Sequence, residues 1–277
     1  MTICLGALCR ENADGDTVVL ASDRMVTWMG LTEFEHQVPK VHQVSASTWA
    51  LIAGDALAGA RIARDVARAA STSGVSVEDV ANLIANRYAE VRIEAAAANI
   101  LTPRGMTLQQ FYQMHQQLLP QITGGIDTAL ANYNLGVDMI VAGVDGSGGH
   151  LFTVGNPGSM AQCHDVIGTV AVGSGFIHAI QSMIGFRHAS MDPQKDVLFR
   201  VFASKRRAEL APGVGHETDL AVINIHGARH LSRATLDELD RIYAAVGAAS
   251  ETRLGEDVAN LTLEFDPEDG DNGGPVP

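Results

Sequence analysis

Basic residues are scarce in this sequence. Lys and Arg number 19 against 32 Asp and Glu, which gives a formal net charge of -13 at pH 7. A protein that binds nucleic acid needs a basic face that displaces counterions from phosphate, so we expect no nucleic-acid partner. Aromatic residues make up only 5% of the chain although 46% of it is apolar, so Ala, Val, Ile and Leu must fill most of the core.

Cysteine is equally rare, and long apolar runs are missing. Cys4, Cys9 and Cys163 are an odd, sparse set, unlike the dense pairs of a secreted disulfide scaffold. Cys4 and Cys9 fall on opposite faces of one predicted strand, which favours core packing over a metal pair or a cysteine nucleophile. The first residues, MTICLGALC, have no basic leader and no run long enough to span a membrane, so we expect a cytoplasmic protein without a membrane segment.

Acidic residues gather near the C-terminal end. Residues 264–277 contain five Asp or Glu and no Lys or Arg. Such a segment has too little apolar surface to offset the entropy of ordering it, so we predict a disordered acidic tail over 263–277. Residues 1–262 show no internal repeat and no linker rich in Pro, Gly or Ser, and we expect them to form one domain.

Strand and helix patterns come in blocks rather than in strict alternation. Apolar runs bounded by turn signals predict strands over residues 3–9, 17–21, 49–53, 137–144, 150–154, 166–172 and 219–225. Helical periodicity and capping pairs predict helices from 55 onward and over 77–98, 108–132, 176–184, 197–210 and 235–246, with a kink at Pro120. Lys205, Arg206 and Arg207 fall near one helix end, where positive charge suits the dipole. This order argues for layered α+β packing over a doubly wound parallel sheet.

Four short segments near the start of the chain place reactive side chains at the predicted ends of strands. Thr2 follows the initiator Met and heads a strand, and Ser22-Asp23-Arg24 ends the next one. Lys40 stands alone before an apolar run, and Gly54 lies at a strand-to-helix corner. Further along, the segment Val172-Gly173-Ser174-Gly175 precedes a predicted helix.

In this order, the segments resemble those of proteasome β-type subunits and their bacterial relatives, and the MTxCLG start is most similar to the bacterial group known as Anbu. The Gly-Ser-Gly run is similar to the one that opens the third major helix of that family. The resemblance spans roughly residues 2–225, with its specific motifs in the first third and in the Gly-Ser-Gly segment. It implies the four-layer αββα sandwich of N-terminal-nucleophile hydrolases, to which this sequence adds an enlarged helical insertion at 95–135.

The resemblance also implies a role for each matching residue. After removal of Met1, Thr2 would be the nucleophile, Lys40 the buried cation beside it, and Asp23 the carboxylate that holds Lys40. The backbone N–H of Gly54 would form the oxyanion hole, and Ser174 would lie near the free α-amino group. A threonine hydroxyl needs a base, and an α-amino group with an ordinary pKa of about 7.7–8.0 supplies one on the same residue. A neighbouring cation lowers the proton affinity of that amine further.

The implied protein is a cytoplasmic threonine peptidase or amide hydrolase that needs no cofactor and assembles with itself into a ring or spiral. An unidentified ATPase partner is left open. The alternative is a non-catalytic scaffold subunit with the same fold. Three features depart from the family: residues 211–216 lack the Asp and Ser that proteolytic β-type subunits place before the last long strand, the first hairpin is longer than the family's usual one, and the insertion has no counterpart that we can assign. Its apolar side chains, expected to serve subunit packing, are Phe111, Tyr112, Met114, Leu118 and Leu119.

Two other chemistries have weaker support in the sequence. Gly173-Ser174-Gly175 between a strand and a helix is similar to a dinucleotide fingerprint, but His178 occupies the third glycine position and no acidic residue ends a following strand. His216, His226 and His230 lack the compact spacing of metal ligands. We therefore predict neither a metal nor another cofactor.

Overall fold

The computed structural model describes residues 2–11, 15–28, 32–36, 40–70 and 74–259. The chain divides into two compact units, Met1–Ser232 and Arg233–Pro277. The sequence predicts one domain over 1–262, and that boundary stays a prediction. The tail expected at 263–277 lies outside the described residues. Among the helices described, none is long and apolar enough to cross a membrane.

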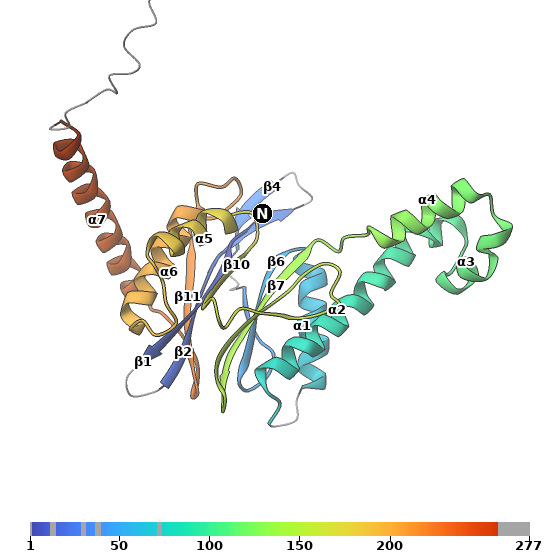
Figure 1. Cartoon of the computed structure of the whole chain (residues 1–277), viewed down its shortest axis with the longest axis horizontal. Coiled ribbons are helices and arrows are strands. Elements are labelled where there is room, and N and C mark those ends of the chain that lie inside the picture. The colour runs from blue at the N-terminus through green and yellow to red at the C-terminus, as the bar shows by residue number, and fades with distance from the viewer. Residues whose placement is uncertain (1, 12–14, 29–31, 37–39, 71–73, 260–277) are drawn as a thin grey trace, which may run out of the picture. The chain divides into compact units, whose positions relative to one another are not determined.

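Two antiparallel five-stranded sheets form the centre of the first unit (Figure 1). One sheet has the order β10-β1-β2-β11-β12, with β1 Cys4–Glu11, β2 Gly15–Asp23, β10 Thr169–Val172, β11 Thr218–Asn224 and β12 Gly227–His230. The expected first hairpin is present, since Cys4 pairs with Ser22 and Glu11 pairs with Gly15. Its strands extend beyond their apolar runs because the ladder continues through polar residues on both sides of the turn.

The second sheet has the order β5-β6-β7-β8-β9. Its strands are β5 Val41–Gln43, β6 Thr48–Gly54, β7 Val137–Asp145, β8 Gly148–Val154 and β9 Gln162–Cys163. The hairpin of β7 and β8 forms where the sequence predicts it. A separate two-stranded sheet, β3 Met25–Trp28 with β4 Thr32–Glu35, was not expected from the sequence.

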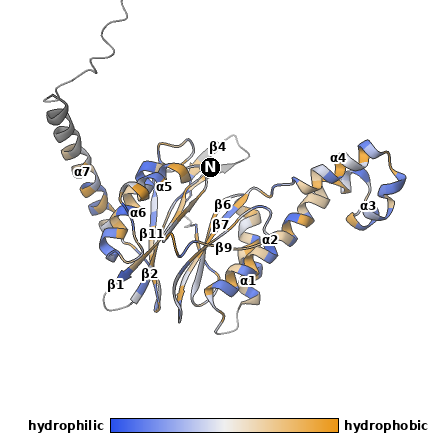
Figure 2. Ribbon diagram, viewed as in Figure 1, coloured by the Kyte–Doolittle hydropathy of each residue, from blue (hydrophilic) through white to orange (hydrophobic). Residues whose placement is uncertain are grey.

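Apolar side chains fill the space between the two sheets. Further apolar side chains fill the space between the outer face of each sheet and the helices that cover it. Leu8 and Leu20 from the first sheet pack with Leu51, Ile140 and Leu151 from the second. Helices α1 Ala56–Ala69 and α2 Val77–Ile100 cover β6, β7 and β8, whereas α5 Phe176–Gly185 and α6 Gln194–Ala208 pack on β1, β2 and β10. Figure 2 shows apolar residues along the strands of both sheets. The α+β class predicted from the sequence is confirmed.

The insertion at 95–135 is helical, but the single kinked helix predicted over 108–132 is wrong. It divides into α3 Leu108–Met114, the 3₁₀ turn η2 His115–Gln117 and α4 Pro120–Ala131, after a first 3₁₀ turn η1 Thr102–Arg104. Pro120 begins α4 because a first-turn residue needs no N–H partner within the helix. Leu101, Phe111 and Ile126 form a small separate core here. Figure 1 shows α3 and α4 beside the C-terminal half of α2.

The remaining helices follow the sequence with shifted ends. Helix α6 begins three residues before the predicted start, at Gln194, directly after Pro193. In the second unit, α7 runs over Arg233–Ala259, well past the predicted end at 246. Its charged residues interrupt the apolar periodicity, which is why the pattern alone gave a shorter helix.

Candidate active site

Thr2 lies at the start of β1, between the end of β2 and the segment that follows β10. Asp23 N donates to Ile3 O over 3.2 Å, so the contact between the first two strands continues to the head of β1. On the other side, Gly175 N donates to Thr2 O over 3.3 Å. Gly173 has φ +97°, and a Cβ there would lie 2.3 Å from Thr2 O, so only glycine fits this close approach.

Three side chains meet at this point: Thr2, Asp23 and Lys40. Lys40 Nζ donates to Thr2 Oγ1 and, over 2.7 Å, to Asp23 Oδ1. The Thr2 hydroxyl donates to the same carboxylate oxygen. Thr2 is 4% exposed, Asp23 is fully buried, and the Lys40 side chain is 15% exposed. The pair of opposite charges is therefore shielded from water and acts directly on the hydroxyl between them.

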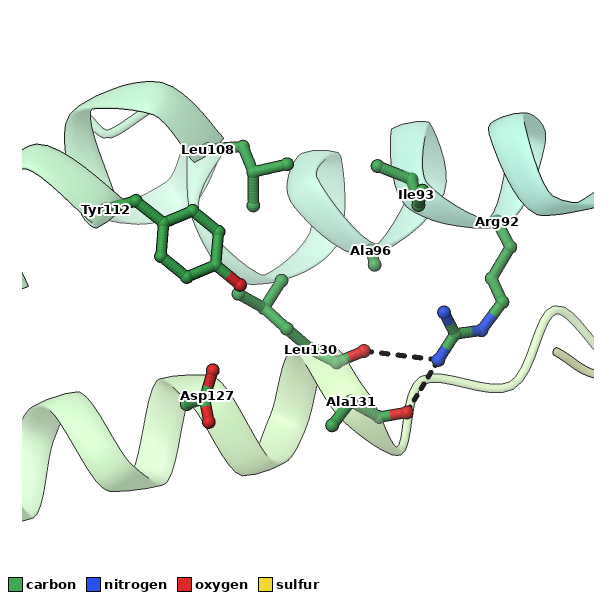
Figure 3. Close-up of a pocket in the computed structure, with 8 residues that line it drawn as sticks. All are labelled: Arg92, Ile93, Ala96, Leu108, Tyr112, Asp127, Leu130 and Ala131. Atoms are coloured by element: carbon green, nitrogen blue, oxygen red, sulfur yellow. Dashed lines mark hydrogen bonds between the residues drawn. The ribbon is translucent and has the colours of Figure 1, made fainter. Parts of the chain in front are cut away.

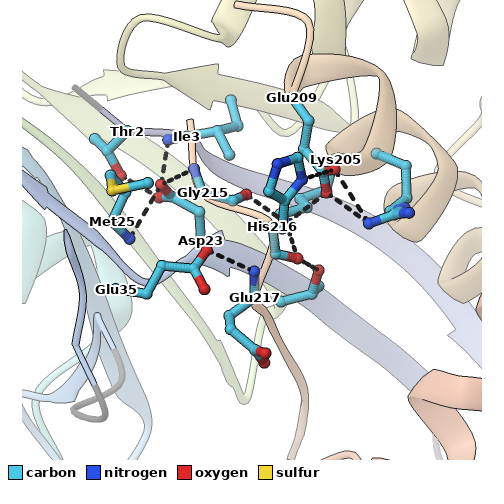
Figure 4. A network of polar contacts seen from close by, with 12 residues as sticks. Thr2, Ile3, Asp23, Met25, Glu35, Lys205, Glu209, Gly215, His216 and Glu217 are labelled. Atoms are coloured by element: carbon cyan, nitrogen blue, oxygen red, sulfur yellow. Dashed lines mark hydrogen bonds and ion pairs between the residues drawn. The ribbon is translucent and has the colours of Figure 1, made fainter. Parts of the chain in front are cut away.

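Backbone groups hold the Asp23 carboxylate on both oxygens. Oδ1 also accepts from Ile3 N over 3.1 Å, and Oδ2 accepts from Gly215 N over 2.9 Å and from Met25 N over 3.3 Å (Figure 4). With these donors and Lys40, the lone pairs of the carboxylate are all engaged. Asp23 is therefore suited to orient Lys40 and Thr2, and another group must take the proton of the hydroxyl.

Ser174 lies at the backbone of Thr2, as the resemblance implies. Thr2 N donates to Ser174 Oγ over 3.2 Å, and Ser174 Oγ donates to Thr2 O over 3.3 Å. The Ser174 hydroxyl thus contacts the nitrogen that becomes an α-amine if the Met1–Thr2 bond is cleaved. Its part in catalysis stays a prediction.

Gly54 lies at the end of β6 on the same side of the sheets as Thr2. Lys40 directly precedes Val41, which pairs with Leu51 of β6, and Cys4 Sγ lies 3.6 Å from Ile52 O. Gly54 has φ +90°, and a Cβ would lie 2.0 Å from Gly136 O, so a side chain is excluded. The role of the Gly54 N–H as an oxyanion donor stays a prediction.

Cys4 faces the same region but is unsuited to nucleophilic chemistry. Burial raises the pKa of its thiol to about 12, although the nearby Lys40 ammonium acts in the opposite direction. The thiol is therefore protonated at neutral pH, and only a thiolate attacks carbonyl carbon effectively. Cys4 packs in the core between the sheets, in agreement with the sequence interpretation.

Asp219, which follows the segment 211–216, pairs with Arg24 and does not contact the Thr2 cluster in the described part of the chain. Asp219 in β11 accepts from Arg24, with Nη2 2.5 Å from Oδ1 and Nε 3.0 Å from both oxygens. This hydrogen bond raises the pKa of the Arg24 guanidinium, against the opposing effect of burial. The ion pair ties the end of β2 to β11 one residue after Asp23. Residues 211–216 reach the Thr2 cluster through a backbone group, Gly215 N.

A second polar cluster, at the β7–β8 turn, was not expected from the sequence. Ser147 Oγ lies 2.9 Å from His150 Nε2, and His150 Nδ1 lies 2.7 Å from Asp165 Oδ2, which is the connectivity of a Ser-His-Asp triad. However, Ser147 Oγ also donates to Asp145 Oδ1 over 2.5 Å. The same carboxylate oxygen accepts from Ser147 N over 2.8 Å and lies 3.4 Å from His150 Nε2. These contacts join neighbouring residues of the turn, so the cluster stabilises the β7–β8 turn.

Replacing Asp145 by Asn is expected to destabilise the first unit by about 2 kcal/mol at pH 7. Burial opposes ionisation, but hydrogen bonds from Ser147 and from Val77 N at the start of α2 lower the pKa of Asp145 from 3.8 to about 2. Stability from a lowered pKa is present above 3.8 and is lost as pH falls toward 2. Urea unfolding at several pH values should show the gap between Asp145→Asn and wild type closing below pH about 4, and a pH-independent gap would contradict this account.

A cavity of 240 Å³ lies in the helical insertion, between α2, α3 and α4 (Figure 3). Tyr112 and Asp127 line it beside apolar side chains. Arg92 at its edge donates to Leu130 O over 3.3 Å and to Ala131 O over 2.6 Å. These bonds engage the guanidinium in joining α2 to the end of α4, so it braces the insertion.

No protein-family model matches this chain, and a comparison with curated proteins also finds no match. The family resemblance drawn from the motifs therefore stays a prediction. Any assignment of function rests on the geometry around Thr2, Asp23 and Lys40.

Proposed function

We propose that this chain is a threonine-type N-terminal-nucleophile hydrolase that cleaves peptide or other amide bonds once the Met1–Thr2 bond has been cleaved. The observation that carries the proposal is the buried contact of the Thr2 hydroxyl with both the Asp23 carboxylate and the Lys40 ammonium. Desolvating two charges is costly, and such clusters gather at functional sites. Here both charges act on a hydroxyl at the N-terminal end of the chain.

Each group has a defined part in the proposed reaction. The α-amine of Thr2 accepts the hydroxyl proton while Oγ1 attacks the carbonyl carbon of the substrate. Lys40 stabilises the negative charge that develops on Oγ1, and the backbone N–H of Gly54 stabilises the charge on the carbonyl oxygen. The amine then gives the proton to the leaving nitrogen as the C–N bond breaks. Water hydrolyses the resulting ester and restores Thr2.

Cleavage before Thr2 is essential to this chemistry. While Met1 is attached, Thr2 N is an amide that donates its hydrogen to Ser174 Oγ. An amide nitrogen cannot accept a proton at neutral pH, so the cluster lacks a base. Cleavage converts the same nitrogen into an amine without moving the residues that hold Thr2.

The proposal includes the fold of the family and self-assembly. Two helices outside each of two facing sheets support the assignment to the αββα sandwich of N-terminal-nucleophile hydrolases. Tyr112, Met114 and Leu119 of the insertion are exposed apolar side chains, which supports a role of this region in contacts between copies. Phe111, in contrast, is buried in the insertion's own core.

A non-catalytic scaffold subunit is the second candidate. It is favoured by the segment 211–216, which contacts Asp23 through a backbone N–H instead of the acidic and hydroxyl side chains of proteolytic relatives. The two candidates differ in the reactivity of Thr2.

Mass spectrometry can distinguish the candidates. A peptide β-lactone, which is opened by hydroxyl nucleophiles, is expected to form one ester on protein purified from its native host without Met1, and fragmentation should place it on Thr2. The matched control is the same chain with an uncleaved N-terminal extension, which should remain unmodified because it has no α-amine at Thr2. Quantitative retention of Met1, or a processed chain that assembles but forms no adduct, would favour the scaffold.

A further inference from the structure

Lys205 is a buried lysine outside the cluster around Thr2. It lies in α6, and its side chain is fully buried. A lysine is rarely buried without partners, because its ammonium loses the hydration that stabilises it. Burial accordingly lowers the pKa of Lys205, while the hydrogen bond to Glu209 and the charge of Asp23 oppose that effect. A buried ammonium so close to Asp23 requires an explanation.

The ammonium connects α6 to the segment 211–217. Lys205 Nζ donates to Gly215 O and to His216 O, each over 2.9 Å, and to Glu209 Oε1 over 2.7 Å (Figure 4). Its three donors are therefore all used. Two of them hold successive carbonyl groups of a segment that belongs to no helix or strand before β11.

The same segment delivers a hydrogen bond to the candidate nucleophile's carboxylate. Gly215 N donates to Asp23 Oδ2 over 2.9 Å, while Asp23 Oδ1 contacts Thr2 and Lys40. Lys205 and Asp23 thus hold opposite sides of one glycine: the ammonium binds its carbonyl and the carboxylate accepts from its N–H. A shift of Gly215 would change the orientation of the Asp23 carboxylate, and with it the positions of Lys40 and the hydroxyl.

A second contact fixes the segment from the side of β4. Glu217 N donates to Glu35 Oε1 over 2.9 Å. A Cβ on Gly215 would lie 2.6 Å from the same oxygen, so the segment is packed tightly between α6 and the β3–β4 hairpin. Glu35 and Lys205 therefore hold neighbouring residues from two directions.

We propose that Lys205 is a positioning residue for the Thr2 site, because it holds residues 211–217 where the N–H of Gly215 fixes the Asp23 carboxylate. The inference rests on the proposed function for its effect on catalysis. We call the hydrogen bonds from Lys205 to the carbonyl groups of Gly215 and His216 the clamp. Its effect on residues 211–217 can be tested without measuring activity.

Lys205→Met tests the clamp with little loss of packing. Methionine keeps an apolar stem of similar length but donates no hydrogen bond. Glu209 keeps partners in this variant, since Arg206 Nη1 lies 3.1 Å from both of its oxygens and His216 Nδ1 lies 2.8 Å from Oε2. Lys195→Met, on an exposed lysine of the same helix, is the matched control.

Hydrogen exchange by mass spectrometry gives the readout that is independent of activity. In Lys205→Met, the peptide covering 211–217 is expected to exchange about tenfold faster or more, while peptides from β1 and β2 stay unchanged. For the active enzyme, we expect kcat to fall roughly 10- to 100-fold with KM unchanged, because the carboxylate is misplaced but no substrate contact is lost. Lys195→Met should alter neither quantity.

The outcomes separate the clamp from the proposed function. Unchanged exchange at 211–217 overturns the inference, and so does equal acceleration in every peptide, which would make Lys205 a residue of global stability. An inactive wild type with the local exchange effect overturns the proposed function and leaves the clamp standing. If Lys205→Met does not fold, Lys205→Gln decides in the same way: its shorter side chain and two N–H hydrogens cannot serve all three acceptors, so faster exchange confined to 211–217 supports the clamp and unchanged exchange overturns it.

Discussion

Thr2→Ala is expected to reduce the rate of amide hydrolysis by roughly 10⁴-fold or more, because it removes the attacking oxygen and leaves only binding and oxyanion stabilisation. The cluster around it should remain assembled, since Ile3 N, Met25 N and Gly215 N still hold Asp23. Rates should be measured as kcat/KM on a mixture of peptide amides, with intact mass confirming that Met1 is absent from the variant.

Thr2→Ser is the matched control for this loss. Serine supplies both a hydroxyl and an α-amine, so we expect it to keep a substantial part of the activity, whereas alanine supplies only the amine. The rate of the serine variant and of wild type should rise with pH as the amine loses its proton, through an ionisation at or below the ordinary α-amino pKa of about 7.7–8.0. Equal activity of Thr2→Ala and wild type would move the catalytic centre to another residue.

Much of the site could be predicted because its residues fall at the ends of strongly patterned segments. The apolar runs that become β1, β2 and β6 fix where Thr2, Asp23 and Gly54 lie along the chain. In an antiparallel hairpin, the start of one strand meets the end of the next, so Thr2 and Asp23 had to be neighbours. The position of Lys40 came from the order of motifs, since no periodicity surrounds it.

Other parts depend on contacts between segments distant in sequence. Lys205 was interpreted as a dipole partner near a helix end, yet it is buried, because residues 211–217 fold back over α6 and bring two carbonyl groups to it. Pro120 fits both a kink and a helix start. The choice between them is made by packing around Phe111, which favours two short helices over one long helix.

The short β3–β4 hairpin shows the same limit. Its strands have four residues each, too few for a reliable alternation of apolar and polar positions. The hydrogen bond from Glu217 N to Glu35 Oε1 is one of the contacts that join this hairpin to the remainder of the fold. The apolar and polar pattern around Glu35 cannot predict a contact with Glu217, because the two residues are far apart in sequence.

Lys40→Met is expected to lower kcat by roughly 10³-fold and to destabilise the first unit by about 3 kcal/mol. The catalytic loss follows from removal of the one cation that contacts both Thr2 Oγ1 and Asp23 Oδ1 in the described part of the chain. The stability loss follows from leaving a fully buried carboxylate without its counter-ion. Backbone N–H groups still bind Asp23 in this variant. We therefore expect a loss of stability near the lower end of the range for a broken buried ion pair.

Activity and urea unfolding measured on the same preparation separate these two effects. Gln43→Met, at an exposed position of β5 close to Lys40, controls for the introduction of a methionine and should change neither. Because the ion pair is largely shielded from solvent, the destabilisation should also persist at high salt, unlike that of a surface pair. A Lys40→Met protein with wild-type turnover would show that the ammonium only supports the fold, and the proposed role of Thr2 would then lack the cation on which it depends.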